Sequence, residues 1–181
     1  MPKGSRIESV VARQVFTWRN HPGVETTVTT VNDATGVATV TAGLSVGDYE
    51  VKFAYDGGTR WEGLGVQRAV DNVNDVIAPV LKGIDATRQI EIDRLMLELD
   101  GTSDRSRLGG NAIASVSAAV LKAAANSLGI PLYEHIGGVN ACVLPVPAAG
   151  LMNGARRYGG GERAGDQPGY SMMCYGFDTF A

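Results

Sequence analysis

Polar and apolar residues alternate along residues 6–41, which is the pattern of strands that bury one face. Two groups of turn-forming residues divide this region into three runs, namely His21-Pro22-Gly23 and the stretch from Asn32 to Gly36. The alternating rows are Val11, Arg13 and Val15, then Val24, Thr26, Val28 and Thr30, and last Val37 to Thr41. We therefore predict a three-stranded antiparallel meander.

Beyond residue 47 the apolar residues recur every three or four positions, which is the period of amphipathic helices. Three helices are predicted, and a glycine follows each of them, at Gly83, Gly101 and Gly129. We expect Asn111 to cap the third helix, because an asparagine side chain accepts hydrogen bonds from the amides of a first turn. The apolar stripes are Val66, Ala69, Val70, Val73, Ile77 and Leu81, then Ile92, Leu95, Met96 and Leu99, then Ile113, Val116, Val120 and Ala124. This order predicts an α+β unit whose helices pack on one face of the sheet.

The last part of the chain changes character again. Two short apolar runs, residues 143–147 and 172–175, predict buried strands, and a loop rich in glycine and charge, residues 153–169, separates them. We therefore expect one domain over residues 1–139 and the beginning of a second over residues 140–181.

Composition narrows the range of functions. The chain has 181 residues, of which 44% are hydrophobic and 19% charged, and a formal net charge of -3. These values are typical of a globular protein and give no basic field for nucleic acid or for a membrane surface. No apolar run reaches the length of a signal peptide or a membrane span, so we expect a cytoplasmic protein. Cys142 and Cys174 stand far apart, without the spacing of a disulfide framework or a zinc site, and are expected to be reduced.

A set of short motifs in a fixed order resembles the enolase family. The motifs are Ala12-Arg13, Pro22 with Val24-Glu25, Gly43, Ser45 and Gly47, Glu98-Leu99-Asp100-Gly101-Thr102, Gly110-Asn111-Ala112-Ile113, Ile136-Gly137-Gly138 and Leu144-Pro145-Val146-Pro147. The resemblance implies an enolase-like N-terminal capping domain over residues 1–139, followed by the first elements of a (β/α)8 barrel. Such a barrel needs roughly 200 to 250 residues, so we expect the chain to be truncated.

The resemblance also implies a reaction, the Mg²⁺-dependent dehydration of 2-phosphoglycerate to phosphoenolpyruvate in glycolysis, by a full-length protein that is usually a cytosolic homodimer. The proton removed lies next to a carboxylate and is very weakly acidic, so divalent metal charge has to stabilise the dianionic intermediate. In this family the metal carboxylates and the lysine base come from later barrel strands. The fragment alone is therefore expected to be inactive.

One loop carries the residues that the resemblance assigns to ligands. It consists of Ala42, Gly43, Leu44, Ser45, Val46 and Gly47, and is called the ligand loop below. Ser45 matches a serine that coordinates magnesium in the family, and Gly43 matches a glycine that lets the backbone approach the substrate. Three residues of the loop, Ala42, Leu44 and Val46, replace Ser, Ala and Thr of the family. Taken by residue type alone, the same loop also fits a plain flexible connection.

The second departure from the family lies in the loop of residues 153–169. Arg157 stands where the family has a histidine, and it either binds an anionic group of the substrate or is a solvated loop residue. The family's general-acid glutamate is not matched, and Tyr170, Glu162 and Asp166 are only weak candidates for its role. Two alternatives therefore stay open: an enolase-like enzyme for a different phosphorylated or phosphonate hydroxy acid, and a non-catalytic binding protein with the enolase fold.

Overall fold

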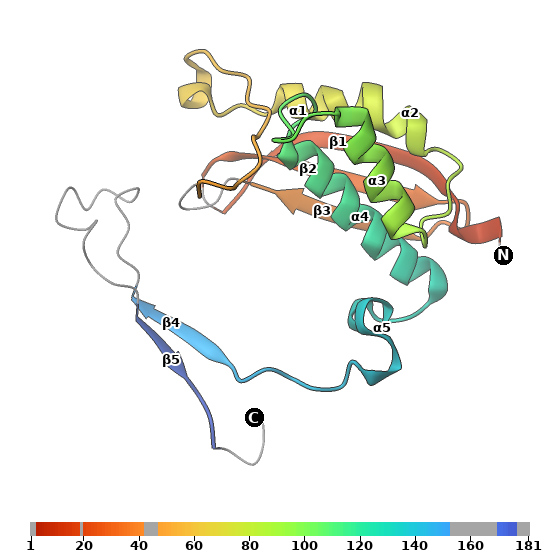
Figure 1. Ribbon diagram of the computed structural model, residues 1–181, viewed down its shortest axis with the longest axis vertical. Coiled ribbons are helices and arrows are strands. Elements are labelled where there is room, and N and C mark those ends of the chain that lie inside the picture. The colour runs from red at the N-terminus through yellow and green to blue at the C-terminus, as the bar shows by residue number, and fades with distance from the viewer. Residues whose placement is uncertain (1–2, 19, 42–46, 153–169, 177–181) are drawn as a thin grey trace. The chain divides into compact units, whose positions relative to one another are not determined.

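Figure 1 shows the computed structural model of the chain, in which residues 3–18, 20–41, 47–152 and 170–176 are described. The chain divides into two compact units, residues 1–138 and 139–181.

The first unit contains the predicted meander. Its strands are β1 (Ile7–Phe16), β2 (Pro22–Thr30) and β3 (Thr35–Val40). They pair antiparallel in the order β1-β2-β3. The predicted row on β2, from Val24 to Thr30 at every second residue, is buried, which confirms the alternation inferred from the sequence.

Both turns of the meander are shorter than predicted. Pro22 and Gly23, expected in the first turn, already pair with the end of β1. The chain reverses before them, where Asn20 takes a left-handed backbone conformation with φ 57°, and asparagine tolerates this region better than most residues. In the second turn Asp33 plays the same part with φ 64°, while Gly36 belongs to β3. The sequence pattern therefore predicts turns that are too long, because it assigns proline and glycine to turns and both residues also occur at strand ends.

Most helices of the first unit cover one face of the sheet, while the last, short one packs against the helix before it (Figure 1). They are α1 (Gln67–Asp71), a π-helical segment (Asn72–Ile77), α2 (Ala78–Leu81), α3 (Gln89–Asp100), α4 (Gly110–Leu128) and α5 (Leu132–Gly137). Short 3-10 turns occupy Lys3–Ser5, Arg60–Gly63 and Gly138–Asn140. The arrangement confirms the predicted α+β unit, and α5 is an additional short helix that the pattern did not predict.

The first predicted helix is continuous but not regular. α1, the π-helical segment and α2 follow one another without a break, and the amide of Ala78 donates to the carbonyl of Val73, five residues back. Pro79 comes next and has no N–H to offer the carbonyl of Asp75, so the ordinary hydrogen-bond ladder is interrupted here in any case. All six residues of the predicted stripe are buried.

Gly36 lets α4 lie directly on β3. A Cβ atom at this position would overlap the carbonyl oxygen of Ala119 and the amide nitrogen of Ala123. Nearby, the hydroxyls of Thr26 and Ser115 form a buried hydrogen bond of 2.8 Å between β2 and α4. The helix and the sheet are therefore joined by close backbone contact as well as by apolar side chains.

Side chains and loops cover the two edges of the sheet. On β1, Ile7 exchanges backbone hydrogen bonds with the 83–84 turn, and the Asn74 amide binds both the N–H and the C=O of Ala12, at 2.8 and 3.1 Å. On β3, Lys122 and Asn126 of α4 donate to backbone carbonyls at 2.8 and 2.6 Å. Covered edges protect a sheet from pairing with foreign strands.

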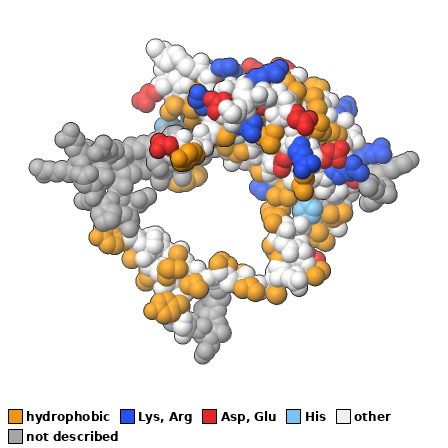
Figure 2. All heavy atoms as spheres, viewed as in Figure 1, with side chains coloured by type: hydrophobic (Ala, Val, Ile, Leu, Met, Phe, Trp, Pro, Cys, Tyr) orange, Lys and Arg blue, Asp and Glu red, His pale blue; other side chains and the backbone are white. Residues whose placement is uncertain are grey.

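The second unit contains a two-stranded antiparallel hairpin of β4 (Ala148–Met152) and β5 (Tyr170–Met173). The strand expected at residues 143–147 is wrong in position, since Pro145 and Pro147 cannot donate to a ladder and β4 begins only after them. The expected burial is also wrong, because every residue of β5 is exposed. Figure 2 shows apolar side chains gathered on this unit.

No single helix of the described residues is long and apolar enough to cross a membrane. Only together do the stretches Gly110–Leu128 and Leu132–Asn140 reach the length and apolar composition of a span, and the chain bends by 101° between them. The first of the two is α4, whose buried side belongs to the core of the first unit.

Candidate functional site

The ligand loop predicted from the sequence is described only at its ends. Residues 42–46, which include Gly43 and Ser45, lie outside the described residues. The structure places Thr41, where the chain leaves β3, and Gly47, where the described chain resumes. These two ends and the segments that hold them border the ligand loop.

The end at Thr41 lies in a closely packed corner of the sheet. The Oγ1 atom of Thr17 lies 3.3 Å from Oγ1 of Thr41 and 3.1 Å from the carbonyl oxygen of His21. At position 23 this corner has room only for glycine, since a Cβ there would lie 2.7 Å from the Thr17 methyl group and 2.9 Å from the carbonyl oxygen of Val40. Steric contact thus fixes where the chain leaves the sheet.

The end at Gly47 is closed by a reciprocal pair of hydrogen bonds. The amide of Gly47 donates to Oε1 of Glu50 at 3.0 Å, and the amide of Glu50 donates to the carbonyl of Gly47 at 3.2 Å. The Glu50 carboxylate thereby accepts from the Gly47 amide, which in an isolated turn would donate to water.

The segment of residues 50–56, called the return segment below, forms neither helix nor strand, yet its backbone is bound to the loop before α4. The amide of Lys52 donates to the carbonyl of Asp104, and the amide of Gly110 donates to the carbonyl of Lys52, both at 2.8 Å. The Lys52 ammonium also pairs with the Asp104 carboxylate at 3.0 Å. Both side chains are exposed, so this ion pair adds little stability and the backbone bonds carry the attachment.

Asn111 holds the next part of the return segment. Its Oδ1 accepts from the amide of Ala54 at 2.9 Å, and its Nδ2 donates to the carbonyl of the same residue at 3.3 Å. The prediction that Asn111 caps α4 is therefore wrong: Gly109 is the cap residue, Asn111 lies in the first turn, and its side chain is fully buried. A capping pattern describes local bonds only and cannot find a partner that lies far away in the sequence.

Asp56, at the end of the return segment, caps a helix across the sequence. Its carboxylate accepts from the amides of Gln67 at 3.0 Å and Arg68 at 2.8 Å. These are first-turn amides of α1 that have no partner within the helix. The sequence reading missed Asp56, since it looked for caps directly before each helix.

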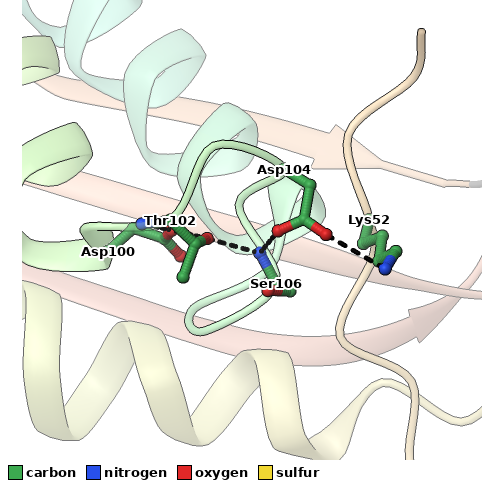
Figure 3. A network of polar contacts seen from close by, with 5 residues as sticks. All are labelled: Lys52, Asp100, Thr102, Asp104 and Ser106. Carbon is green, nitrogen blue, oxygen red and sulfur yellow. Dashed lines mark hydrogen bonds and ion pairs between the residues drawn. The ribbon is translucent and has the colours of Figure 1, made fainter.

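Asp100 organises the loop between α3 and α4 (Figure 3). Its carboxylate accepts from the amide and the hydroxyl of Thr102 and from the amide of Leu108, the last at 2.7 Å. The amide of Ser106 then donates to the Thr102 hydroxyl at 3.0 Å and to the Asp104 carboxylate at 3.2 Å. These contacts set the loop to which the return segment is attached.

The acidic residues of this loop are fixed charges. Burial raises the pKa of Asp100, but hydrogen bonds from Thr102 and Leu108 and the nearby charge of Arg105 outweigh it, and the net pKa lies below the ordinary value of 3.8. Hydrogen bonding from Ser106 and from Lys52 holds the pKa of Asp104 well below that value. Both carboxylates stay ionised at neutral pH, so neither is suited to transfer protons.

Of the remaining candidate site residues, only Tyr170 lies in the described part of the chain. Tyr170 lies on β5 with 53% of its surface exposed, and Arg157, Glu162 and Asp166 fall outside the described residues. Among the residues that are described, no three His, Cys, Asp or Glu side chains lie close enough together to hold a metal ion. Cys142 and Cys174 are both free.

Comparison with known proteins agrees with the motif order and the fold. The model of the enolase N-terminal domain matches residues 7–136, which covers the sheet, the return segment and α1 to α4. The chain belongs to the enolase family. The match confirms the family resemblance and the capping-domain fold inferred from the sequence.

Curated relatives extend the similarity into the second unit. The chain is 48% identical over 177 residues to the enolase of Thermococcus kodakarensis, 49% over 177 residues to that of Pyrococcus furiosus and 47% over 179 residues to that of Methanopyrus kandleri. These alignments cover 96% to 97% of the chain and 40% of each enolase. The chain thus spans about 40% of the length of these relatives.

Proposed function

We propose that this chain is part of an enolase-type hydro-lyase that dehydrates 2-phosphoglycerate to phosphoenolpyruvate with Mg²⁺, in the cytoplasm. The observation that carries the proposal is identity of close to half the residues with three enolases over nearly the whole chain. Sequence identity this high over nearly the whole chain supports the same reaction in this protein.

The chain spans about 40% of the length of these enolases, and we propose that its ligand loop contributes part of a site shared with the rest of a full-length protein. Ser45 would bind magnesium through its hydroxyl, Gly43 would let the backbone approach the substrate, and Arg157 would pair with an anionic group. As the family resemblance implies, we propose that later barrel strands of the full-length protein supply the metal carboxylates and the lysine base. Bound magnesium would stabilise negative charge on the intermediate.

The test is turnover by the full-length protein, followed by the ultraviolet absorbance of phosphoenolpyruvate formed from 2-phosphoglycerate. We expect activity that requires added Mg²⁺ and disappears with a chelator, and a loss of about 100-fold or more in Ser45→Ala, since a charge-stabilising contact is removed. Ser103→Ala, the same change at an exposed position outside the ligand loop, is the matched control and should lose little. Turnover by residues 1–181 alone would contradict the division of labour.

A different acid is the second candidate, and the substitution at residue 157 favours it. Arg157 is permanently charged, whereas the family histidine can exchange a proton. If the substrate differs, the full-length protein should turn over another phosphorylated or phosphonate hydroxy acid faster than 2-phosphoglycerate, and Arg157→His should shift the preference back. Binding without turnover of any such acid would instead identify a non-catalytic binding protein.

We also propose that the protein is a homodimer joined through the uncovered face of the sheet. Exposed on this face are Val11 and Val37, at 57% and 43%, and the ion pair of Arg13 with Glu25 at 2.7 Å. A cation beside a carboxylate suits a two-fold interface, in which each charge can meet its opposite on the second copy.

Val37→Lys is the test of this interface. Val37 faces outward on β3, so the substitution leaves the core of the monomer intact and places a charge in the proposed contact. We expect the full-length protein to sediment as a dimer and Val37→Lys to dissociate at a concentration at least roughly 100-fold higher, because each copy then brings a lysine into the contact and each desolvated charge costs a few kcal/mol. Lys82→Ala on the helix side is the control, and a dimer equally stable in both variants would exclude this face.

A further inference from the structure

The return segment is unusual in how its backbone is satisfied. Residues 50–56 lie beside α4 without joining a sheet, and Ala54 is 3% exposed. A buried peptide group away from a sheet or helix has to find partners elsewhere. For Ala54 both partners come from one side chain, the amide of Asn111, which takes the place of a neighbouring strand.

We propose that Asn111 is a positioning residue for the ligand site: by binding both polar atoms of the Ala54 backbone, it fixes the course of the return segment, which follows Gly47 and the ligand loop along the chain. The proposal rests on the proposed function for its catalytic consequence, though not for its structural one. It gives Asn111 a role beyond helix capping or core packing.

The same chain offers a matched control at Asn74. Its side-chain amide also binds both backbone atoms of one residue, Ala12, at 2.8 and 3.1 Å. Ala12, however, is part of β1 and stays paired with β2 whatever happens at its outer edge. Loss of Asn74 should therefore lower global stability without moving the strand, whereas loss of Asn111 leaves a segment that can relieve its unpaired groups by moving toward water.

Hydrogen exchange of the full-length protein tests the structural step. In Asn111→Ala we expect the amide of Ala54 to exchange at least about tenfold faster, beyond any change in the most protected core amides. In Asn74→Ala the amides of the return segment should change only as far as the core amides do. Equal exchange at Ala54 in both variants would overturn the proposal.

Kinetics test the catalytic step. At conditions where both variants remain folded, kcat for 2-phosphoglycerate should fall roughly 10- to 100-fold in Asn111→Ala and less than about twofold in Asn74→Ala, with a smaller change in KM, because misplacement of a loop end costs orientation. Equal kinetics in the two variants would refute a role in positioning while leaving the proposed function in place. Absence of turnover in the wild type would refute the proposed function and its link to Asn111, and the exchange result would still decide whether Asn111 holds the segment.

A pH profile of Asn111→Asp separates hydrogen bonding from packing. A protonated carboxyl can accept from the Ala54 amide and donate to the Ala54 carbonyl, as the native amide does, whereas a carboxylate can only accept and repels the carbonyl oxygen. Burial raises the pKa of such a group. Protection of Ala54 and kcat, each relative to wild type at the same pH, should therefore recover as the pH falls from roughly 8 to roughly 5. A profile parallel to that of Asn111→Ala would overturn the proposal.

Discussion

Gly36→Ala is expected to destabilise the first unit by about 3 kcal/mol or more, the upper end of what overpacking costs. The added methyl group meets the backbone of α4 at Ala119 and Ala123 rather than the flexible end of a side chain. Helix and strand would have to separate to admit it, and the packing between them, including the buried hydrogen bond of Thr26 with Ser115, would be disturbed.

Urea unfolding followed by tryptophan fluorescence measures this effect. Both tryptophans, Trp18 and Trp61, lie in the first unit, and Trp61 packs edge-on against Phe16 with 5.4 Å between ring centres, so its emission reports this fold. Thr35→Ala is the matched control, since it places alanine at the adjacent exposed position of β3 and should cost less than about 1 kcal/mol. A Gly36→Ala variant as stable as the control would show that α4 does not lie directly on β3.

Asp100→Ala is expected to cost about 3 kcal/mol, because it leaves the amides of Thr102 and Leu108 and the Thr102 hydroxyl without their acceptor. The Asp100 side chain is 1% exposed, so water cannot easily replace it. Asp100→Asn keeps the size and one acceptor oxygen, and should lose less. The same fluorescence measurement applies, and a loss below about 1 kcal/mol in Asp100→Ala would show that the loop is held by other contacts.

The lowered pKa of Asp100 also predicts the sign of a pH effect. A carboxyl whose pKa is lower in the folded state stabilises the fold above its unfolded value of 3.8, and this contribution is lost as the pH falls through the folded value. The free energy of unfolding of the wild type should therefore fall between pH of about 5 and about 2, and less steeply in Asp100→Asn. Equal slopes in the two proteins would show that Asp100 is not preferentially ionised in the folded state.

Periodicity was enough to predict the strands and the three main helices of the first unit. The row on β2 and the stripe from Val66 to Leu81 each bury a whole face, and hydrophobic burial dominates the energetics of such elements. The stop signals at Gly101 and Gly129 are also confirmed, since both residues take positive φ angles that favour glycine. The π-helical segment was not predictable in this way, because its stripe has nearly the spacing of an α-helix.

The contacts around the ligand site were harder to predict, because they join side chains to backbone over long distances in the sequence. Asn111 and Asp56 bind backbone groups far from their own positions, so no local pattern contains both partners. The prediction of buried strands in the second unit was wrong for a different reason. Apolar composition predicts burial of these strands, but it does not identify the surface that would cover them.

The covered margins of the sheet have a consequence for how this protein can associate. Asn74, Lys122 and Asn126 occupy outward backbone atoms of Ala12, Val37 and Thr35, so a foreign strand would have to displace these side chains before it could pair at those positions. Association through the side chains of the uncovered face needs no such displacement and, in the two-fold arrangement proposed above, closes at two copies. Replacement of these three side chains would free the backbone atoms that they bind and favour edge-to-edge pairing of strands, which can continue into fibrils.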